Sequence, residues 1–311
     1  MTERMMKLGF LTASLPGWSL EELATWASDH SYSALEVAAW PAEGGRPHTA
    51  AHIDVARLDD RAARKIGDAF ARHGLTLSSL AFYENNLHPD LRARAKAHEH
   101  LRKCIDAAAM LGCPTVGTFI GRDPSLPVEA NRAQAEEVFA PMVERATACG
   151  VTIIIENCPM PGWHPDGYPA NLAYSPQFWD WMIPLGLKLN FDPSHLAWLG
   201  IDPVAKAREY ARHIAHVQAK DVEINRAALD EYGFYGKALN RDDPWDSGWW
   251  RYRIPGLGQI DWRKLIDTLY DVGYTGVVSV EHEDPVWSGT DDRIEMGLIL
   301  AQRELGRYIP G

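Results

Sequence analysis

Three carboxylates in the second half of the chain each close a short apolar run that has the composition of a β-strand. They are Glu156 in VTIIIE, Asp192 in LKLNFD and Glu281 in GVVSVE. A single carboxylate at a strand end usually faces water or caps the next helix. Three that meet would repel one another unless some are protonated or a cation lies between them. We therefore predict a divalent-metal site, with Mn²⁺ expected first and Mg²⁺, Co²⁺ or Zn²⁺ as alternatives.

A fourth run, HIAHVQAKD, places three polar residues at alternate positions. His216, Gln218 and Lys220 share one face of a strand because side chains alternate with a period of two. The amide oxygen of Gln218 is the predicted fourth metal ligand. His216 is expected one layer deeper, as a hydrogen-bonded interior residue or a substrate contact. Lys220 is expected to hold an anionic substrate oxygen, or to form a salt bridge with Asp221 or Glu283.

The elements that must position these residues alternate regularly along the chain. Strands are expected at 7–13, 33–40, 75–82, 114–120, 151–156, 187–192, 213–221 and 276–281. Helices are expected near 19–30, 59–73, 90–111, 129–149, 175–184, 202–212, 261–272 and 291–306. Eight such units fit a doubly wound sheet or a closed barrel. The length of 311 residues and the lack of a glycine-rich nucleotide loop favour an α/β fold of the (β/α)₈ TIM-barrel type, as a single domain over residues 1–311.

Three long segments follow predicted strands and are expected as loops at the mouth of the barrel. They lie near 42–54, 157–171 and 222–260. The third is rich in aromatic residues, among them Trp249 and Trp250, which are predicted to stack on sugar rings. Loop packing or a subunit interface would explain the same aromatic cluster.

Composition excludes several classes of protein. The 42 Asp and Glu residues outnumber the 31 Lys and Arg, and the formal net charge of −11 disfavours a nucleic-acid-binding surface. No segment is apolar over the length that a membrane span needs, and residues 1–16 lack a convincing signal-peptide cleavage site. The four cysteines form no CxxC pair, so we expect reduced thiols in a cytoplasmic protein.

Five motifs occur in an order that resembles the xylose-isomerase-like superfamily of sugar isomerases and epimerases. They are IENCP, NFDPSHLAW, HVQAKD, PGLGQIDW and VSVEHEDP, and the segment LAFYENNLHPD is also similar. The resemblance implies that a Mn²⁺-type ion is bound by residues from four consecutive strands. It carries ligand roles onto Glu156, Asp192 and Glu281. Gln218 stands where relatives have the metal-binding histidine, which implies weaker binding or a different metal preference.

Three further residues are candidate substrate contacts. The resemblance gives His195, in DPSH, a place beside the substrate and the metal, while the alternative is that it orients Asp192. Glu36, in the second strand, can bind a sugar hydroxyl. His88, in NNLHPD, can contact substrate or cap the third helix.

The predicted chemistry is proton transfer at a carbon next to a carbonyl, with Glu156 and Glu281 as base and acid. This implies a metal-dependent sugar isomerase or epimerase that works through an enediolate. The alternative is a lyase that cleaves 3-oxo-glycosides by β-elimination, similar to the large subunit of C-glycoside deglycosidases and needing a small partner subunit. A homo-oligomer is also compatible with the sequence. A barrel that has lost activity and only binds sugar remains a further alternative, whereas the charge and Gln218 disfavour an endonuclease of the abasic-site type.

Overall fold

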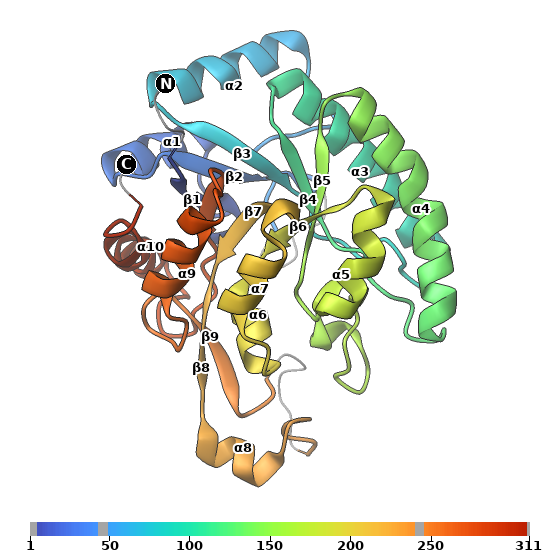
Figure 1. Cartoon of the computed structure of the whole chain (residues 1–311). Helices are drawn as coiled ribbons and strands as arrows, with labels where there is room; N and C mark the ends of the chain where they lie inside the picture. The colour runs from blue at the N-terminus through green and yellow to red at the C-terminus, as the bar shows by residue number, and fades with distance from the viewer. Residues whose placement is uncertain (1–4, 43–48, 240–245, 310–311) are drawn as a thin grey trace.

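Eight parallel strands form a closed barrel in the computed structural model, which describes residues 5–42, 49–239 and 246–309 (Figure 1). Around the barrel the strands follow in the order β1, β10, β7, β6, β5, β4, β3 and β2, and β2 closes against β1. The barrel strands are β1 Lys7–Leu11, β2 Ala34–Ala38, β3 Thr76–Ala81, β4 Thr115–Thr118, β5 Thr152–Glu156, β6 Lys188–Phe191, β7 Ile214–Ala219 and β10 Val277–Val280. The predicted (β/α)₈ barrel is confirmed.

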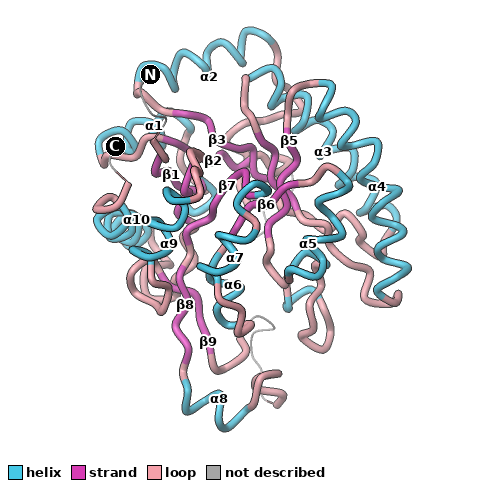
Figure 2. Tube along the Cα trace, viewed as in Figure 1, coloured by secondary structure: helices cyan, strands magenta, loops and turns pink. Residues whose placement is uncertain are grey.

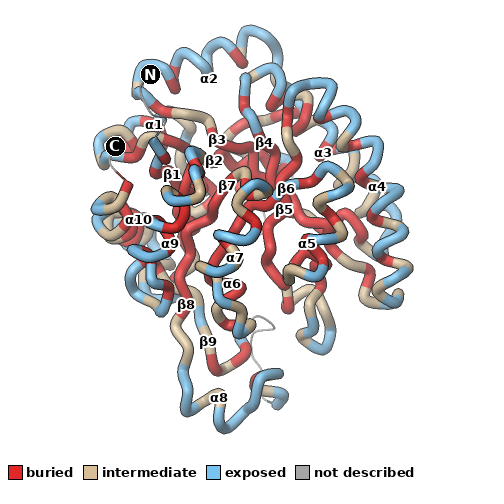
Figure 3. Tube along the Cα trace, in the orientation of Figure 1, coloured by how far each residue is buried: buried red, intermediate tan, exposed pale blue. Residues whose placement is uncertain are grey.

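Helices surround the barrel on its outside (Figure 2). They are α1 Leu20–Asp29, α2 Asp60–Arg72, α3 Leu91–Leu111, α4 Val128–Ala148, α5 Pro176–Met182, α6 Pro193–Trp198, α7 Pro203–Glu209, α9 Trp262–Asp271 and α10 Asp291–Leu305. Short 3₁₀ turns lie at Thr12–Ser14, Pro161–Trp163, Leu172–Tyr174, Ile183–Leu185 and Ala211–His213. The barrel strands are largely buried, and most of the surrounding helices, with α6 as an exception, expose their outer faces to solvent (Figure 3).

Local sequence signals fix where helices begin. Ser19 and Glu22 form a reciprocal capping box at the start of α1, because the Ser19 hydroxyl accepts from Glu22 N and the Glu22 carboxylate accepts from Ser19 N. After β6 the sequence predicts one helix near 202–212, but the structure has two, α6 and α7. The additional helix α6 begins because Asp192 caps its first turn and Pro193 occupies its first position.

The third predicted mouth segment contains secondary structure of its own. Strand β8 Asp221–Ile224 pairs antiparallel with β9 Trp250–Arg253, and α8 Arg226–Tyr232 lies at the far end of this hairpin, away from the barrel (Figure 1). Residues 43–48 of the first predicted loop and 240–245 of the third lie outside the described residues. Within the described ranges, no helix is both long and apolar enough to cross a bilayer.

The buried carboxylate of Asp221 fastens the hairpin to the loop before α9. It accepts hydrogen bonds from Gly256 N at 3.0 Å, Ile260 N at 3.0 Å and Trp262 Nε1 at 2.9 Å. A side chain at Gly258 would collide with this carboxylate, which explains the glycine there. The motif PGLGQIDW therefore has a structural role: its hydrogen bonds to Asp221 hold the hairpin of β8 and β9 at the carboxyl-terminal end of the barrel strands.

Candidate metal centre

The structure brings Glu156, Asp192 and Glu281 together at the carboxyl ends of β5, β6 and β10. One carboxylate oxygen from each lies within 4.8 Å of the other two. All three side chains are buried. Each residue ends a barrel strand or follows one directly, and in this fold such residues line the mouth where active sites are built.

The side chain of Asn157 holds the backbone of Asp192 next to β5. The side-chain Nδ2 of Asn157 donates to Asp192 O at 2.9 Å, and its Oδ1 accepts from Asp192 N at 2.8 Å. One oxygen of Asp192, Oδ1, accepts from Ser194 N at 2.7 Å and so caps α6. The other oxygen, Oδ2, is left for the centre of the site. The sequence offered helix capping and a place in the site as alternatives for Asp192. The structure shows both, because Oδ1 caps α6 and Oδ2 faces the other carboxylates.

Two cationic side chains lie among the carboxylates. Lys220 Nζ is 2.8 Å from Glu281 Oε2, 3.1 Å from Glu283 Oε2 and 3.3 Å from Asp192 Oδ2. His195 Nε2 is 3.0 Å from Glu156 Oε1 and 3.1 Å from Asp192 Oδ2. Of the two predicted salt-bridge partners, Lys220 pairs with Glu283, whereas Asp221 accepts hydrogen bonds from the loop before α9. The repulsion that the sequence implies is thus partly neutralised by the chain itself.

The charges and the burial shift the pKa values of these groups in opposite directions. Burial raises the pKa of the Glu156 carboxyl and raises that of Glu281 well above its usual range. Burial also disfavours ionised Asp192, but the charges of His195 and Lys220 outweigh it and lower the pKa of Asp192. The site thus combines one carboxylate kept ionised with two that hold a proton more readily, an arrangement suited to acid–base chemistry.

Gln218 belongs to a polar network inside the barrel. Its Nε2 donates to Tyr83 Oη at 3.2 Å and to Glu36 Oε1 at 3.3 Å, while Tyr83 also donates to Glu36 and accepts from Asn190 Nδ2. Strands β7 and β2 are not neighbours, so the contact from Gln218 to Glu36 crosses the interior. The amide nitrogen is therefore occupied, and Oε1 is the atom left over.

The remaining candidates have hydrogen bonds outside the group of three carboxylates. His216 Nδ1 is 2.9 Å from Asn190 Oδ1, and its Nε2 is 3.1 Å from Ser78 Oγ, so it is a hydrogen-bonded interior residue. His88 Nδ1 accepts from Asp90 N at 3.0 Å in the turn before α3, but Asp90 is the residue that caps this helix, so His88 does not cap it as the sequence had offered. Glu36 is fully buried in the network around Tyr83 and Gln218.

The two tryptophans of the hairpin differ in their surroundings. Trp249 is buried, and its Nε1 donates to Phe234 O, so it packs the hairpin and offers no open face to a sugar. Trp250 stacks on Trp198 with ring centroids 4.5 Å apart and planes 12° apart. Trp198 and Trp250, with Phe234 and Tyr235, line a cavity of about 80 Å³ beside the 157–171 loop.

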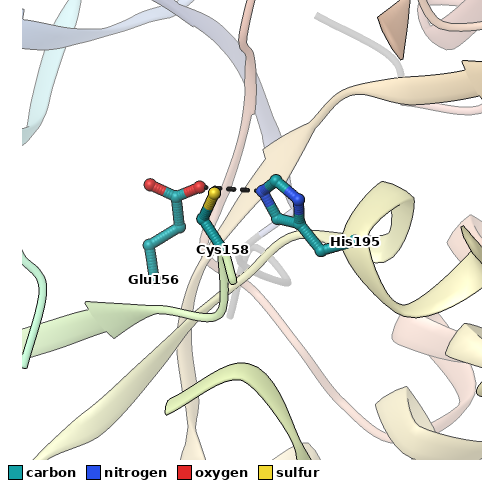
Figure 4. A group of neighbouring side chains, drawn as sticks. All are labelled: Glu156, Cys158 and His195. Carbon is teal, nitrogen blue, oxygen red and sulfur yellow. Dashed lines mark hydrogen bonds and ion pairs between the residues drawn. The ribbon is translucent and has the colours of Figure 1, made fainter. Parts of the chain in front are cut away.

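Two residues of the site have contacts that were not predicted from the sequence, although Tyr252 belongs to the aromatic segment that was expected to stack on sugar rings. Tyr252, on β9, places its hydroxyl 2.9 Å from His195 Nδ1 and its ring 4.5 Å from Lys220 Nζ. Cys158 lies beside Glu156 and His195, and Figure 4 shows the three side chains pointing toward one another. The strand period signals Cys158, because it lies two residues beyond Glu156. No local pattern signals Tyr252, whose position depends on how the hairpin packs.

The residues present fit a divalent ion. The oxygens of Glu156, Asp192 and Glu281 are hard donors at close mutual distance. Among the described residues, Gln218 Oε1 is a buried oxygen without a hydrogen-bond partner, whereas Asp192 Oδ2 has ion-pair contacts with His195 and Lys220. A buried oxygen without a partner destabilises the fold, and ligation would remove that cost. Ligation by Gln218 remains a prediction, and so does the identity of the metal.

Residues 24–300 match the family described as xylose isomerase-like TIM barrel, and the chain belongs to that family. The resemblance seen in the five motifs is thereby confirmed. The uncharacterized protein YfiH of Bacillus subtilis (strain 168) is 28% identical over 309 residues, which cover 90% of this chain and 93% of YfiH. Inosose dehydratase of Lacticaseibacillus casei is 30% identical over 103 residues, which cover 32% of each chain.

Solved structures of other proteins share the fold over nearly the whole chain. The structure of the IOLI protein with a zinc atom has a TM-score of 0.69 at 17% identity and covers 98% of this chain and 100% of that chain. D-psicose 3-epimerase from Clostridium cellulolyticum H10, solved with D-tagatose, has a TM-score of 0.67 at 16% identity and covers 98% and 99%. At these identities the likeness shows the fold.

Proposed function

We propose that the protein is a divalent-metal-dependent sugar isomerase or epimerase. The observation that carries the proposal is the buried trio of Glu156, Asp192 and Glu281, whose oxygens lie within 4.8 Å of one another at the barrel mouth. D-psicose 3-epimerase, which has the same fold, supports this class of reaction. The substrate would be a sugar with a carbonyl next to a carbon that bears a hydroxyl.

Glu156 and Glu281 approach the substrate from different sides. Their strands, β5 and β10, are three steps apart around the barrel. One carboxylate removes the proton from the carbon next to the carbonyl, and the other returns a proton to the opposite face or to the neighbouring carbon. The first outcome is epimerisation and the second is aldose–ketose isomerisation.

The other residues of the site bind and orient. A divalent ion held by Glu156, Asp192 and Glu281, with Gln218 as the predicted fourth ligand, would supply Lewis-acid stabilisation of the carbonyl oxygen. Lys220 Nζ, already 2.8 Å from Glu281, can donate to a substrate oxygen that becomes negative during proton removal. His195 is held by Tyr252 on one side and by Glu156 on the other, and so fixes the direction of the Glu156 carboxylate.

A second candidate is a lyase that begins with the same proton removal. After the proton leaves, the bond to a substituent on the next carbon breaks and a double bond forms, as in dehydration or cleavage of a 3-oxo-glycoside. The aromatic side chains of Trp198, Trp250, Phe234 and Tyr235 favour this candidate, because they offer apolar surface on which part of a flat leaving group can stack. The match to inosose dehydratase also supports an elimination. Any small partner subunit belongs to this second candidate.

The test is solvent isotope exchange. Metal-loaded enzyme is incubated in D₂O with a panel of ketoses and 3-oxo-glycosides, and deuterium at carbon is measured by NMR. We expect exchange beside the carbonyl, and an epimer or an elimination product distinguishes the two candidates. Glu156→Gln and Glu281→Gln should each lower the exchange rate by at least about 10²-fold. Glu137→Gln, an exposed position on α4, is the control. Full exchange in either site variant would refute the two-glutamate mechanism.

A further inference from the structure

The segment after β5 carries a thiol into the site. Cys158 lies two residues beyond Glu156, and its side chain is buried. The side-chain Nδ2 of Asn171 donates to Glu156 O at 3.0 Å and to Cys158 O at 2.8 Å. One side chain therefore fixes the backbone at both residues. The thiol and the carboxylate therefore leave the same short segment with a defined spacing.

Glu156, Cys158 and His195 converge as closely as the three carboxylates do. One ligand atom from each lies within 4.8 Å of the other two, and all three residues are buried (Figure 4). The two groups share Glu156 but differ in their other donors. The first group offers oxygen alone, whereas the second offers sulfur, nitrogen and oxygen. Zn²⁺ and Co²⁺ accept mixed donors of this kind, while Mg²⁺ and Mn²⁺ favour oxygen.

The imidazole of His195 is oriented as a metal ligand would be. Its Nδ1 lies 2.9 Å from the Tyr252 hydroxyl, and its Nε2 lies 3.0 Å from Glu156 Oε1. Once the cationic imidazole loses its Nε2 proton to an incoming ion, Nδ1–H can donate to the phenol oxygen, and the lone pair of Nε2 then faces Glu156 and Cys158. A hydrogen bond at the far ring nitrogen is the usual means by which proteins fix the tautomer and direction of a metal-binding histidine.

We propose that Glu156, Cys158 and His195 form a second cation position, selective for Zn²⁺ or Co²⁺, beside the oxygen-rich position and sharing Glu156 with it. Three protein ligands leave the fourth position of a tetrahedral ion open to water or substrate. Binding replaces the thiol proton of Cys158 and the Nε2 proton of His195 with the ion, and both protons pass to solvent. This position goes beyond the proposed function, because it does not depend on which reaction the barrel catalyses.

Cobalt titration of the metal-free protein tests the proposal. Coordination of Co²⁺ by a thiolate gives an intense near-ultraviolet charge-transfer band that oxygen and nitrogen ligands do not give. We expect the band in the unaltered protein, its loss in Cys158→Ser, and its retention in Cys149→Ser, which removes the exposed cysteine. X-ray absorption of the zinc-loaded unaltered protein should show a sulfur neighbour at about 2.3 Å, and this measurement needs no variant. In Cys158→Ser the affinity for Zn²⁺ should fall by at least about tenfold.

Manganese binding, followed by electron paramagnetic resonance, separates this proposal from the proposed function. Retention of Mn²⁺ binding in Cys158→Ser supports two distinct positions. Cobalt that binds without the charge-transfer band, or a band that survives in Cys158→Ser, overturns the Cys158 position and leaves the oxygen-rich site standing. Absence of sulfur around zinc overturns it in the same way. A charge-transfer band in a protein that binds no Mn²⁺ supports the Cys158 position and counts instead against the metal-dependent isomerase.

Discussion

Replacement of Lys220 by methionine is the sharpest test of how the carboxylates tolerate one another. The side chain is 2% exposed, and its Nζ lies within 3.3 Å of an oxygen of Asp192, Glu281 and Glu283. Methionine preserves much of the apolar stem and removes the charge. The substitution therefore isolates the electrostatic contribution of the ammonium group from its packing.

The expected loss follows from burial. Removal of one partner from a buried ion pair typically destabilises a protein by about 3–5 kcal/mol, because the remaining charge stays desolvated and uncompensated. Asp192 is fully buried and stays ionised, whereas Glu281 can relieve its own charge by taking up a proton. We therefore expect Lys220→Met to lower the free energy of unfolding by an amount near the lower end of this range, about 3 kcal/mol at neutral pH in the presence of a chelator.

A divalent ion should restore part of this loss. At a free concentration one hundred times the dissociation constant, an ion stabilises the folded state by about 2.7 kcal/mol. Lys220 repels an ion bound at the same carboxylates, so Mn²⁺ should stabilise Lys220→Met more than it stabilises the unaltered protein. Urea unfolding followed by circular dichroism measures the free energy of unfolding of the unaltered protein and of Lys220→Met, each with chelator and with Mn²⁺.

The matched control is Lys103→Met. Lys103 Nζ lies 2.7 Å from Glu99 Oε1, a similar distance, but this pair is exposed on α3. Its removal should leave the free energy of unfolding unchanged within error, since solvent screens exposed pairs. Equal effects of the two substitutions, or a Lys220→Met protein as stable as the original without metal, would refute the electrostatic reasoning.

Three other changes give independent tests. Gln218→His should tighten metal binding, measured by calorimetric titration, because imidazole is the stronger donor; loss of binding would mean that Gln218 is no ligand. Asn157→Ala should cost about 1–3 kcal/mol in urea unfolding, because Asp192 N loses its buried acceptor, and an unchanged midpoint would contradict this. Burial lowers the pKa of His52 to about 4, so the unfolded chain binds the proton more readily, and the free energy of unfolding should fall by about 2 kcal/mol as the pH drops from 6.5 to 4. His52→Gln should lack this part of the pH dependence, and an unaltered pH profile would show that His52 is not its source.

The barrel was predictable because its strands and helices alternate with strong local signals. Glu156, Asp192 and Glu281 were predictable for the same reason, since parallel strands around a barrel bring their carboxyl ends to one rim. The position of Lys220 was only partly predictable. The strand period gave its face, but its contact with Glu281 depends on how β7 and β10 register, which no local pattern encodes.

The parts that the sequence did not predict depend on tertiary packing. The strand-like composition of the 222–260 segment is weak, and β8 and β9 form because Asp221 fastens them to the loop before α9. Tyr252 reaches His195 only through that arrangement. Trp249 was expected to be a sugar platform, and its burial became evident only from the hairpin fold. Aromatic content indicates an apolar surface but gives no information on which face stays open.

Helix α6 joins two places that are otherwise separate. Asp192 caps its first turn and His195 sits within it, while Trp198 at its last position stacks on Trp250 in the wall of the aromatic cavity. The six residues of α6 thus have the cluster of carboxylates at their amino-terminal end and the cavity at their carboxyl-terminal end. If a molecule in the cavity displaced Trp198 and the helix followed as a unit, Asp192 and His195 would move with it, and cavity occupancy and ion affinity would then change each other by the same factor.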